Sequence, residues 1–485
     1  MTVRTRFRIE YLAAAGAAGI IIWLLFTRPF IGMADSGDFL RVLMTAGLDY
    51  NPAATTYEDR FFSYANQHFA YGSLRGAYIT SQLIPVFIAR GLGWLYDPSL
   101  FNIRILAAVY GALLVAAVYL LVHTGRRYSM AVGVVLTAGL LFVFLDVRYL
   151  AYFNSFFAEP VSLIFLLLTL GTGLRLAHQE EPGRWTLIFF FFCVFMLACG
   201  KLQNTPLGVV FALYGLRFLP LRWDRAWRKL VLICCSALFL LSALLYVFAP
   251  DGLKHINLYQ TVFYGILNKS PDVKGDLKAL GLPEKLAGNA GSNYFQTDVP
   301  IKQDAPEMRV DFYDRMSHGK VMLYYATHPQ RLIGLMERAA HQSVYLKPGY
   351  LGNYEKAEGK PPGAFNDTYS GWSRFKAGHM PNSLLFIVLF YIVYYGVCVI
   401  EWLRAREGSA KMTSELLMLV GFVGFFAFLI PIMGDGLADI EKHLFLFNAA
   451  YDIMLLASAA WLAYRIAVLL GFGRDGRRIS YRSYR

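Results

Sequence analysis

The feature that most constrains this chain is a series of long apolar stretches separated by short polar connections. Crossing the hydrocarbon core of a bilayer takes about 20 residues of helix, and the sequence offers about ten stretches that approach that length. Hydrophobic residues make up 56% of the 485 positions, whereas charged residues make up 16%. We therefore predict an all-α polytopic membrane protein. The predicted spans are 11–30, 101–123, 129–147, 160–176, 185–200, 206–219, 230–248, 384–403, 415–433 and 444–470.

The distribution of Lys and Arg predicts how these spans are oriented. Short loops rich in positive charge stay on the cytoplasmic side. Both termini then face the cytoplasm of a multi-pass protein in the inner (plasma) membrane, and the first stretch is an uncleaved anchor because 29–33 lacks a cleavage pattern. These loops carry most of the net charge of +13, so we predict no nucleic-acid partner. The basic residues are Arg4, Arg6, Arg8, Arg126, Arg127, Arg222, Arg225, Arg228, Lys229, Arg404, Arg406, Lys411, Arg474, Arg477, Arg478, Arg482 and Arg485.

This orientation leaves two large segments outside the cytoplasm. It divides the chain into a membrane core with an outer first loop (1–250), an extracytoplasmic domain (251–382), and the last transmembrane helices with a basic tail (383–485). In the first loop, 78–96 is apolar but interrupted by Pro85 and Arg90, which predicts a helix on the membrane surface. The outer domain is predicted to be a small soluble α or α+β unit with a helix over 321–343.

Two acids follow the first span directly, in the sequence Asp35-Ser36-Gly37-Asp38-Phe39. Carboxylates at the membrane surface suit chemistry on a substrate whose tail lies in lipid and whose reactive end lies in water. Alternatively, they cap the helix that follows, because Asp and Ser are favoured at that position. A cap needs only one of them, so we favour a catalytic role.

A third acid, Glu159, precedes Pro160 at the start of a predicted span, with Tyr152 and Asn154 shortly before it. An acid entering a membrane is costly unless it serves a function. The alternative is that Glu159 only complements the dipole at the start of a helix.

Basic residues occupy two further outer helix ends. Lys201 and Gln203 follow the fifth predicted span, and Lys442 and His443 precede the last one. A cation can neutralise the charge that develops on a departing phosphate. Alternatively, Lys201 extends to the interface as lysines commonly do, and Lys442 and His443 pair with Asp439 and Glu441.

Four motifs together resemble the GT-C superfamily of integral membrane glycosyltransferases, which use lipid-phosphate-linked sugars. The motifs are the acid pair after the first span, the surface helix and second-span entry at 76–104, the sequence Phe157-Ala158-Glu159-Pro160, and the Lys-x-Gln element at 201–203. The acid pair departs from the Asp-Glu form of several relatives, because Ser36 stands in the second place. The layout is similar as well, since GT-C enzymes carry acids and surface helices in the first outer loop.

The resemblance implies roles for these residues. Asp35 is the expected catalytic base and Asp38 the alternate, while Glu159 orients the acceptor or assists the base. The expected substrate-binding residues are Lys201, Gln203, Lys442, His443, Arg41, Tyr152 and Asn154. No cofactor is certain, and use of a divalent metal by Asp35 and Asp38 stays open because two carboxylates do not decide it.

Parts of the outer domain, 259–265, 280–283 and 350–354, are similar to bacterial surface-glycan hexose transferases. This likeness implies a hexose moved from a polyprenyl-phosphate donor to a glycan or lipid-linked acceptor, in contact with membrane lipid, at the outer face. Expected sugar or phosphate contacts in this domain are Lys320, His328, Arg331 and Trp372.

Other classes fit less well. The chain has no G-x-S-x-G, no P-loop and no H-E-x-x-H, so hydrolase, nucleotidase and zinc-protease interpretations lack their signatures. A transporter of lipid-linked sugars would place charges deep in its spans and show matching halves. A membrane glycan ligase or polymerase is the closest rival, and it would need no base after the first span.

Overall fold

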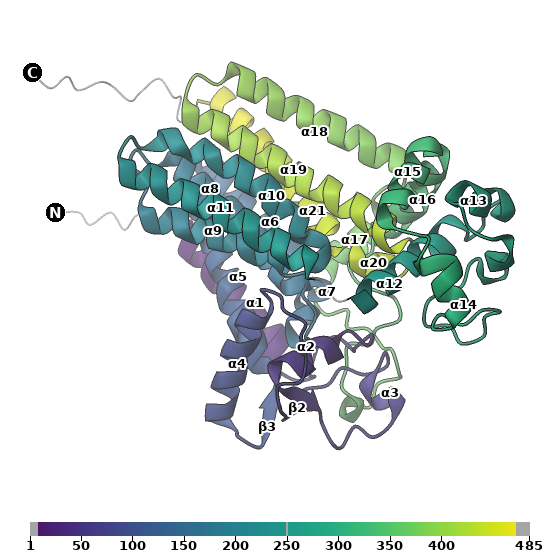
Figure 1. Ribbon diagram of the computed structural model, residues 1–485. Helices are drawn as coiled ribbons and strands as arrows, with labels where there is room; N and C mark the ends of the chain where they lie inside the picture. Colours follow the sequence, from purple (N-terminus) through teal and green to yellow (C-terminus); the bar gives the residue numbers. More distant parts are fainter. Residues whose placement is uncertain (1–7, 249–250, 472–485) are drawn as a thin grey trace, which may run out of the picture.

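The computed structural model describes residues 8–248 and 251–471, which form a bundle of long helices with two segments at one end (Figure 1). By length and composition, seven of the described helices could cross a membrane, or eight if the bent pair Met130–Phe144 and Val147–Asn154 is one span. The chain is thus a mostly helical, multi-pass membrane protein. The seven are α1 (Ile9–Phe26), α5 (Arg104–Gly125), α8 (Glu159–His178), α11 (Arg225–Val247), α18 (Leu384–Arg404), α19 (Gly408–Asp435) and α21 (Phe445–Leu469).

All ten predicted stretches are helical, but three fall short of an unbroken span. The helix α6 (Met130–Phe144) turns by 59° into α7 (Val147–Leu150), which begins where the Asp146 side chain accepts the amide of Arg148. The helix α9 (Arg184–Cys199) has 16 residues, and α10 (Thr205–Gly215) has 11 before a 3-10 turn that contains Pro220. A count of ten crossings is therefore still a prediction.

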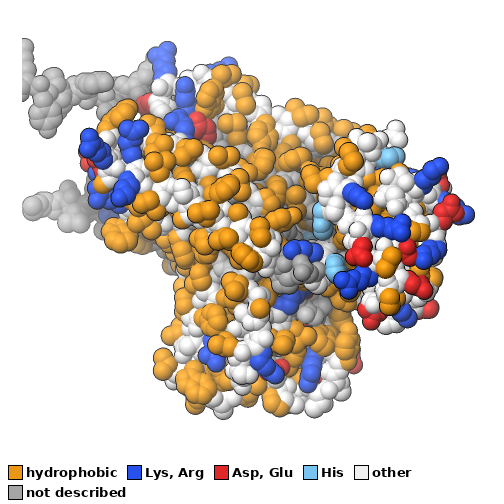
Figure 2. Space-filling model, viewed as in Figure 1, with side chains coloured by type: hydrophobic (Ala, Val, Ile, Leu, Met, Phe, Trp, Pro, Cys, Tyr) orange, Lys and Arg blue, Asp and Glu red, His pale blue; other side chains and the backbone are white. Residues whose placement is uncertain are grey.

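The surface of the bundle agrees with a membrane environment. Figure 2 shows hydrophobic side chains over the helices, whereas Lys, Arg, Asp and Glu gather on the segment at the right and at the opposite end of the bundle. Large apolar side chains face outward on several helices, among them Leu240 (56% exposed), Ile392 (62%) and Leu462 (53%). Such a surface is stable in lipid and would be a liability in water.

The first of these two segments, called the first outer segment after its predicted side of the membrane, contains helices and a sheet. Its helices are α2 (Phe39–Ala46), α3 (Tyr57–Arg60) and α4 (Leu83–Tyr96), and its antiparallel strands are β1 (Leu48–Tyr50), β2 (His68–Tyr71) and β3 (Leu100–Asn102). The register pairs Asp49 with Ala70 and Phe69 with Phe101. The helix predicted over 78–96 is confirmed from Leu83 on. The sheet was not predicted, because strands of three or four residues are too short to show an alternating pattern.

The second outer segment is helical. Apart from an isolated bridge between Tyr354 and Ile31, its described residues contain no strand. The single helix predicted over 321–343 is wrong: α15 ends at Thr327 and α16 begins at Pro329, because a residue before proline is driven out of the helical region. The helices are α12 (Asp251–Tyr259), η4 (Gln260–Ile266), α13 (Val273–Leu280), η5 (Glu284–Asn289), α14 (Pro306–Met308), η6 (Arg309–Tyr313), α15 (His318–Thr327), α16 (Pro329–Gln342), η7 (Lys356–Glu358) and α17 (Gly371–His379).

The loop after α16 fastens the two outer segments together. The backbone amides of Gly32 and Ala34 donate to the carbonyls of Asn353 and Gly352, both at 2.9 Å. A Cβ at Gly352 would lie 2.1 Å from the carbonyl oxygen of Ser63, so only glycine fits this approach. The chain that leads from α1 to the acid pair is therefore held by residues more than 300 positions away.

A buried ion pair joins the second outer segment to the membrane helices. Lys376 on α17 lies 2.7 Å from Asp452 on α21, and their side chains are 2% and 0% exposed. The same carboxylate accepts the indole N–H of Trp372 and the hydroxyl of Tyr149, both at 2.8 Å. Trp372, expected to contact sugar, instead packs inside the protein with 9% exposure. A buried charge is stable only when its hydrogen bonds are made, so this network fixes α17 on α21.

Replacing Trp372 by Phe is expected to lower the free energy of unfolding by about 1.5–3 kcal/mol, because a buried carboxylate loses one hydrogen-bond donor. Thermal unfolding in detergent would measure the effect. Trp223→Phe is the matched control, because Trp223 is 83% exposed. Equal melting temperatures for the two variants would contradict this account of Asp452.

Candidate functional site

Charged side chains from four parts of the chain meet at the end of the bundle opposite the predicted cytoplasmic loops. They come from the turn between α1 and α2, the start of α8, the turn between α9 and α10, and α20 (Ile440–His443) between the last two long helices. All four parts lie at the same end of the bundle, because successive long helices run in alternating directions. The predicted site residues therefore lie together at this end of the bundle, as the predicted topology implied. We call this end, with its charged residues, the acid rim.

Asp35 is enclosed at this rim, with 1% of its surface exposed. One carboxylate oxygen accepts the amides of Gly37 at 2.7 Å and Phe39 at 3.1 Å, and the other accepts the hydroxyl of Tyr50. Burial raises the pKa of Asp35 to about 6, although these hydrogen bonds work against the shift. Gly37 has a φ of +100°, a conformation that favours glycine, and this lets the turn fold back onto the carboxylate.

Asp38 has the opposite environment. Its carboxylate pairs with Arg41, three residues along α2, and with Lys442 at 2.8 Å, and its side chain is 33% exposed. Burial alone would raise the pKa of Asp38, but the positive charges of Lys442 and Arg41 hold it well below its usual range. Asp38 is thus a fixed anion, whereas Asp35 exchanges its proton near neutral pH.

Lys442 is the centre of the network. Its ammonium group, with the side chain 3% exposed, donates to Asp38 at 2.8 Å, to Asp439 at 2.9 Å and to the hydroxyl of Ser36 at 3.2 Å. Burial alone would lower the pKa of Lys442, but the two carboxylates raise it well above its usual value. Asp439 also accepts the hydroxyl of Tyr350 at 2.6 Å. The pairing of Lys442 with Asp439, given above as the alternative to phosphate binding, is present, and it keeps Lys442 charged.

Glu159 and Lys201 form a second ion pair, 2.5 Å apart. Glu159 is 1% exposed, and its other carboxylate oxygen has no hydrogen-bond partner among the described residues. The hydroxyl of Tyr152, whose side chain is fully buried, likewise has none in the described part of the chain. A buried acid with half of its hydrogen-bonding capacity unused suits a role in holding a substrate hydroxyl.

The remaining predicted residues occupy supporting positions. His443 contacts Gln203 at 3.2 Å through one ring nitrogen and Asp435, at the end of α19, at 3.0 Å through the other. Asn154 donates to the carbonyl of Ile31 at 2.7 Å and so holds the chain that leads to Asp35. A substrate contact of Asn154 or His443 remains a prediction.

Sequence reasoning missed the two tyrosines of the site. Tyr50 reaches Asp35 from β1, and Tyr350 reaches Asp439 from the loop that fastens the outer segments. Tyr50 lies in no motif. Tyr350 lies in 350–354, one of the parts similar to hexose transferases, but no role was predicted for it, because its contact depends on a long-range loop. Glu441, which was expected to pair with a cation, instead accepts the backbone amide of Gly349 at 2.9 Å.

Most charged side chains of the rim pair with one another, whereas Asp35 makes no ion pair among the described residues. Across residues 8–248 and 251–471, no group of three or more His, Cys, Asp or Glu side chains is arranged to hold a metal ion. The two oxygens of Asp38 contact Arg41 and Lys442. The rim therefore brings together one buried carboxyl, Asp35, and one carboxylate, Asp38, that is paired with two cations.

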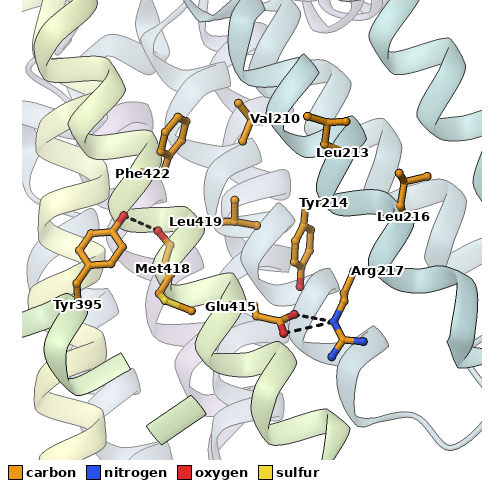
Figure 3. A pocket seen from close by; sticks show the side chains of 10 residues that line it. All are labelled: Val210, Leu213, Tyr214, Leu216, Arg217, Tyr395, Glu415, Met418, Leu419 and Phe422. Atoms are coloured by element: carbon orange, nitrogen blue, oxygen red, sulfur yellow. Dashed lines mark hydrogen bonds and ion pairs between the residues drawn. The ribbon is translucent and has the colours of Figure 1, made fainter. Parts of the chain in front are cut away.

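A separate cavity of about 680 Å³ lies between α10 and the pair α18 and α19 (Figure 3). Its lining is mostly apolar, and at one end Arg217 donates to both oxygens of Glu415, at 3.0 and 3.3 Å. None of the predicted site residues lines it. By chain order, Arg217 and Glu415 lie toward the predicted cytoplasmic ends of their helices, away from the acid rim.

Comparison with known proteins places the chain in one family. The family model described as the YfdI N-terminal transmembrane domain matches residues 2–471. The match covers almost the whole chain, which therefore belongs to this family of multi-pass membrane proteins. Neither the curated proteins nor the solved structures include a match.

Proposed function

We propose that this member of the YfdI N-terminal transmembrane domain family is an inverting glycosyltransferase. It moves a hexose from a polyprenyl-phosphate donor to a cell-surface glycan or lipid-linked acceptor at the outer face of the bacterial inner membrane. The observation that carries the proposal is the division of labour between Asp35 and Asp38, one with a pKa near 6 and the other held ionised by cations. Adjacent carboxylates driven apart in pKa are a recurring arrangement of acid–base catalysis.

The reaction is a single displacement at the anomeric carbon. The acceptor oxygen forms a bond to that carbon as the bond between the carbon and the donor phosphate oxygen breaks, with inversion of configuration. Asp35 takes the acceptor proton, and the polyprenyl phosphate leaves with the electron pair. Lys442, Arg41 and Lys201 supply the positive charge that stabilises this leaving group.

The assignment of Asp35 rather than Asp38 as base follows from their partners. A carboxylate held by two cations attracts a proton weakly, so Asp38 serves to position Lys442 and Arg41. Asp35 makes no ion pair among the described residues, and its second oxygen accepts the Tyr50 hydroxyl. An acceptor hydroxyl that replaces Tyr50 at this oxygen would be within reach of the base, since catalytic hydrogen bonds often form only in the substrate complex.

Tyr50→Phe is expected to move the acidic limb of the pH–activity profile to higher pH. Removing the hydroxyl takes away a hydrogen bond that lowers the pKa of Asp35, so that pKa rises above its value of about 6. The ionised form is the active base. Activity of the wild type therefore rises with pH through about 6, and activity of the variant rises later.

The control for this experiment is Tyr57→Phe, because Tyr57 lies in the same segment and is 68% exposed. The measurement is kcat/KM for sugar transfer between pH 4.5 and pH 8 with both variants. An unchanged acidic limb in Tyr50→Phe would contradict the assignment of Asp35.

A membrane glycan ligase or polymerase is the closest alternative, and a transporter of lipid-linked sugars is the next. A ligase would release a lipid pyrophosphate and use the cations of the rim without a base at position 35. A transporter would move the lipid-linked sugar without cleaving it. Asp35→Asn separates these functions from the proposed one, because only a transferase that uses this base loses its chemistry in the variant.

A further inference from the structure

The second outer segment contains a basic cavity that the proposed reaction does not use. It has a volume of about 260 Å³ and lies between the end of η4, the loop after it and α16. Polar and charged side chains enter it from both sides. They include Asn268, Lys269, Ser270, Arg331 and Arg338, with Gly334 between the two arginines on α16.

The positive charge of this cavity is only partly neutralised. Arg331 pairs with Asp276 at 2.9 Å, and that carboxylate also accepts the hydroxyls of Tyr324 and Ser270. Arg338 donates to the backbone carbonyl of Asn268 at 3.3 Å and has no carboxylate partner among the described residues. Burial lowers the pKa of Arg338, because removing a cation from water disfavours its charged form when no carboxylate is near.

Lys269 adds a further cation. No ion pair or hydrogen bond of its side chain occurs among the described residues, and its backbone has a φ of +58°. Three cations thus face one carboxylate around a space that could hold a small group. A guanidinium without a carboxylate partner tends to bind an oxyanion, because its planar set of N–H donors matches the geometry of phosphate and carboxylate.

Packing between helices connects the cavity with the acid rim. The helix α16 packs against α20, which carries Lys442, and against η4. The helix η4 also lies against the turn before α20. A Cβ at Gly436 in this turn would be 2.8 Å from the carbonyl oxygen of Gln260 and 2.9 Å from the Cα of Gly265, both on η4. A substrate that crosses this part of the surface could therefore reach the cavity and the rim together.

We propose that this cavity binds an oxyanion carried by the acceptor, either a phosphate or a sugar carboxylate. The proposal rests on the proposed function and identifies the class of acceptor as acidic. The volume suits one anionic group rather than a whole saccharide. The anion has two candidate sources, the phosphates of a lipid-linked acceptor and an acidic sugar of a glycan, and both present the same chemistry to Arg338 and Lys269.

The test uses the purified full chain in nanodiscs of neutral lipid, with calorimetric titration of inorganic phosphate, glucuronate and glucose. The cations of the acid rim also attract anions, so the assignment depends on variants of the cavity. A Cβ at Gly334 meets nothing within 4 Å, so a longer side chain there enters the cavity without disturbing the fold. Gly334→Glu adds a negative charge, and Gly334→Ala is its matched control.

We expect at least a tenfold loss of affinity for phosphate or glucuronate in Gly334→Glu and in Arg338→Gln. Gly334→Ala should bind like the wild type, and so should Lys274→Gln, because Lys274 is 71% exposed and lies elsewhere in the same segment. Glucose should not bind the cavity. Preference for phosphate would indicate a lipid-linked acceptor, and preference for glucuronate an acidic glycan.

Equal anion binding by Gly334→Glu and Gly334→Ala would overturn the proposal, as would a wild type that binds neither anion. This outcome is separate from the failure of the proposed function. Sugar transfer that persists while the cavity binds no anion refutes only the acidic acceptor. Anion binding without any transfer refutes the glycosyltransferase assignment and the acceptor as the source of the anion, while the cavity stands as an anion site.

Discussion

Asp35→Asn is expected to lower sugar transfer by about 10³-fold, because a positioned general base typically contributes 10²–10⁴-fold to a rate. The amide has the size of the carboxyl, and its oxygen can still accept the amides of Gly37 and Phe39. The fold should therefore survive while the proton acceptor is lost. Initial rates of transfer, with a melting curve for each protein, measure the effect.

Asp49→Asn is the matched control for this variant. Asp49 lies in the same segment, next to Tyr50, but its side chain is 50% exposed and pairs with Arg75 on the surface. We expect nearly unchanged transfer in the control. Retained transfer in Asp35→Asn would remove the base from the mechanism. Loss in Asp38→Asn alone would make Asp38 the catalytic carboxylate.

Lys442→Gln is expected to reduce transfer by about 10²-fold or more and to weaken donor binding, because one charged donor to a developing oxyanion is commonly worth that much. It should also lower the free energy of unfolding. Removing one partner of a buried ion pair costs about 3–5 kcal/mol. Here the cost should be nearer 2–3 kcal/mol, because the partners Asp38 and Asp439 are 33% and 38% exposed and partly screened by solvent.

The two effects of this variant can be measured separately. Lys442→Arg keeps the positive charge and should recover most of the stability. It should recover less of the activity, because a planar guanidinium does not fit the oxygen acceptors that surround the ammonium group of Lys442. Lys411→Gln is a control at the other end of the bundle, where Lys411 lies over the ring of Trp402. Normal turnover and donor KM in Lys442→Gln would show that Lys442 has only a structural role.

Much of the site could be predicted because a membrane limits where a helix end can lie. Asp38 and Lys442 are 404 positions apart, yet each lies where an apolar stretch ends on the same side. Alternating spans then bring them to one rim. The same reasoning placed Glu159 and Lys201 there, and they form an ion pair.

What could not be predicted depends on contacts without a sequence period. Tyr50 reaches Asp35 from a strand of three residues, and no pattern in three residues indicates a strand. The loop at 352–353 fastens the first segment through backbone hydrogen bonds, which have no side-chain pattern in the sequence. Lys376 and Asp452 gave no signal either, because a buried ion pair is recognised only when its partner is known.

Sugar transfer by the purified protein in nanodiscs would show whether the protein is a glycosyltransferase with Asp35 as its base. A panel of radiolabelled polyprenyl-phosphate hexoses would be offered with a crude membrane acceptor to the wild type, Asp35→Asn and Asp49→Asn. The account predicts that wild type and Asp49→Asn release polyprenyl phosphate and label the acceptor, whereas Asp35→Asn does neither. A folded wild type that turns over none of these donors, or equal release by all three proteins, would contradict it.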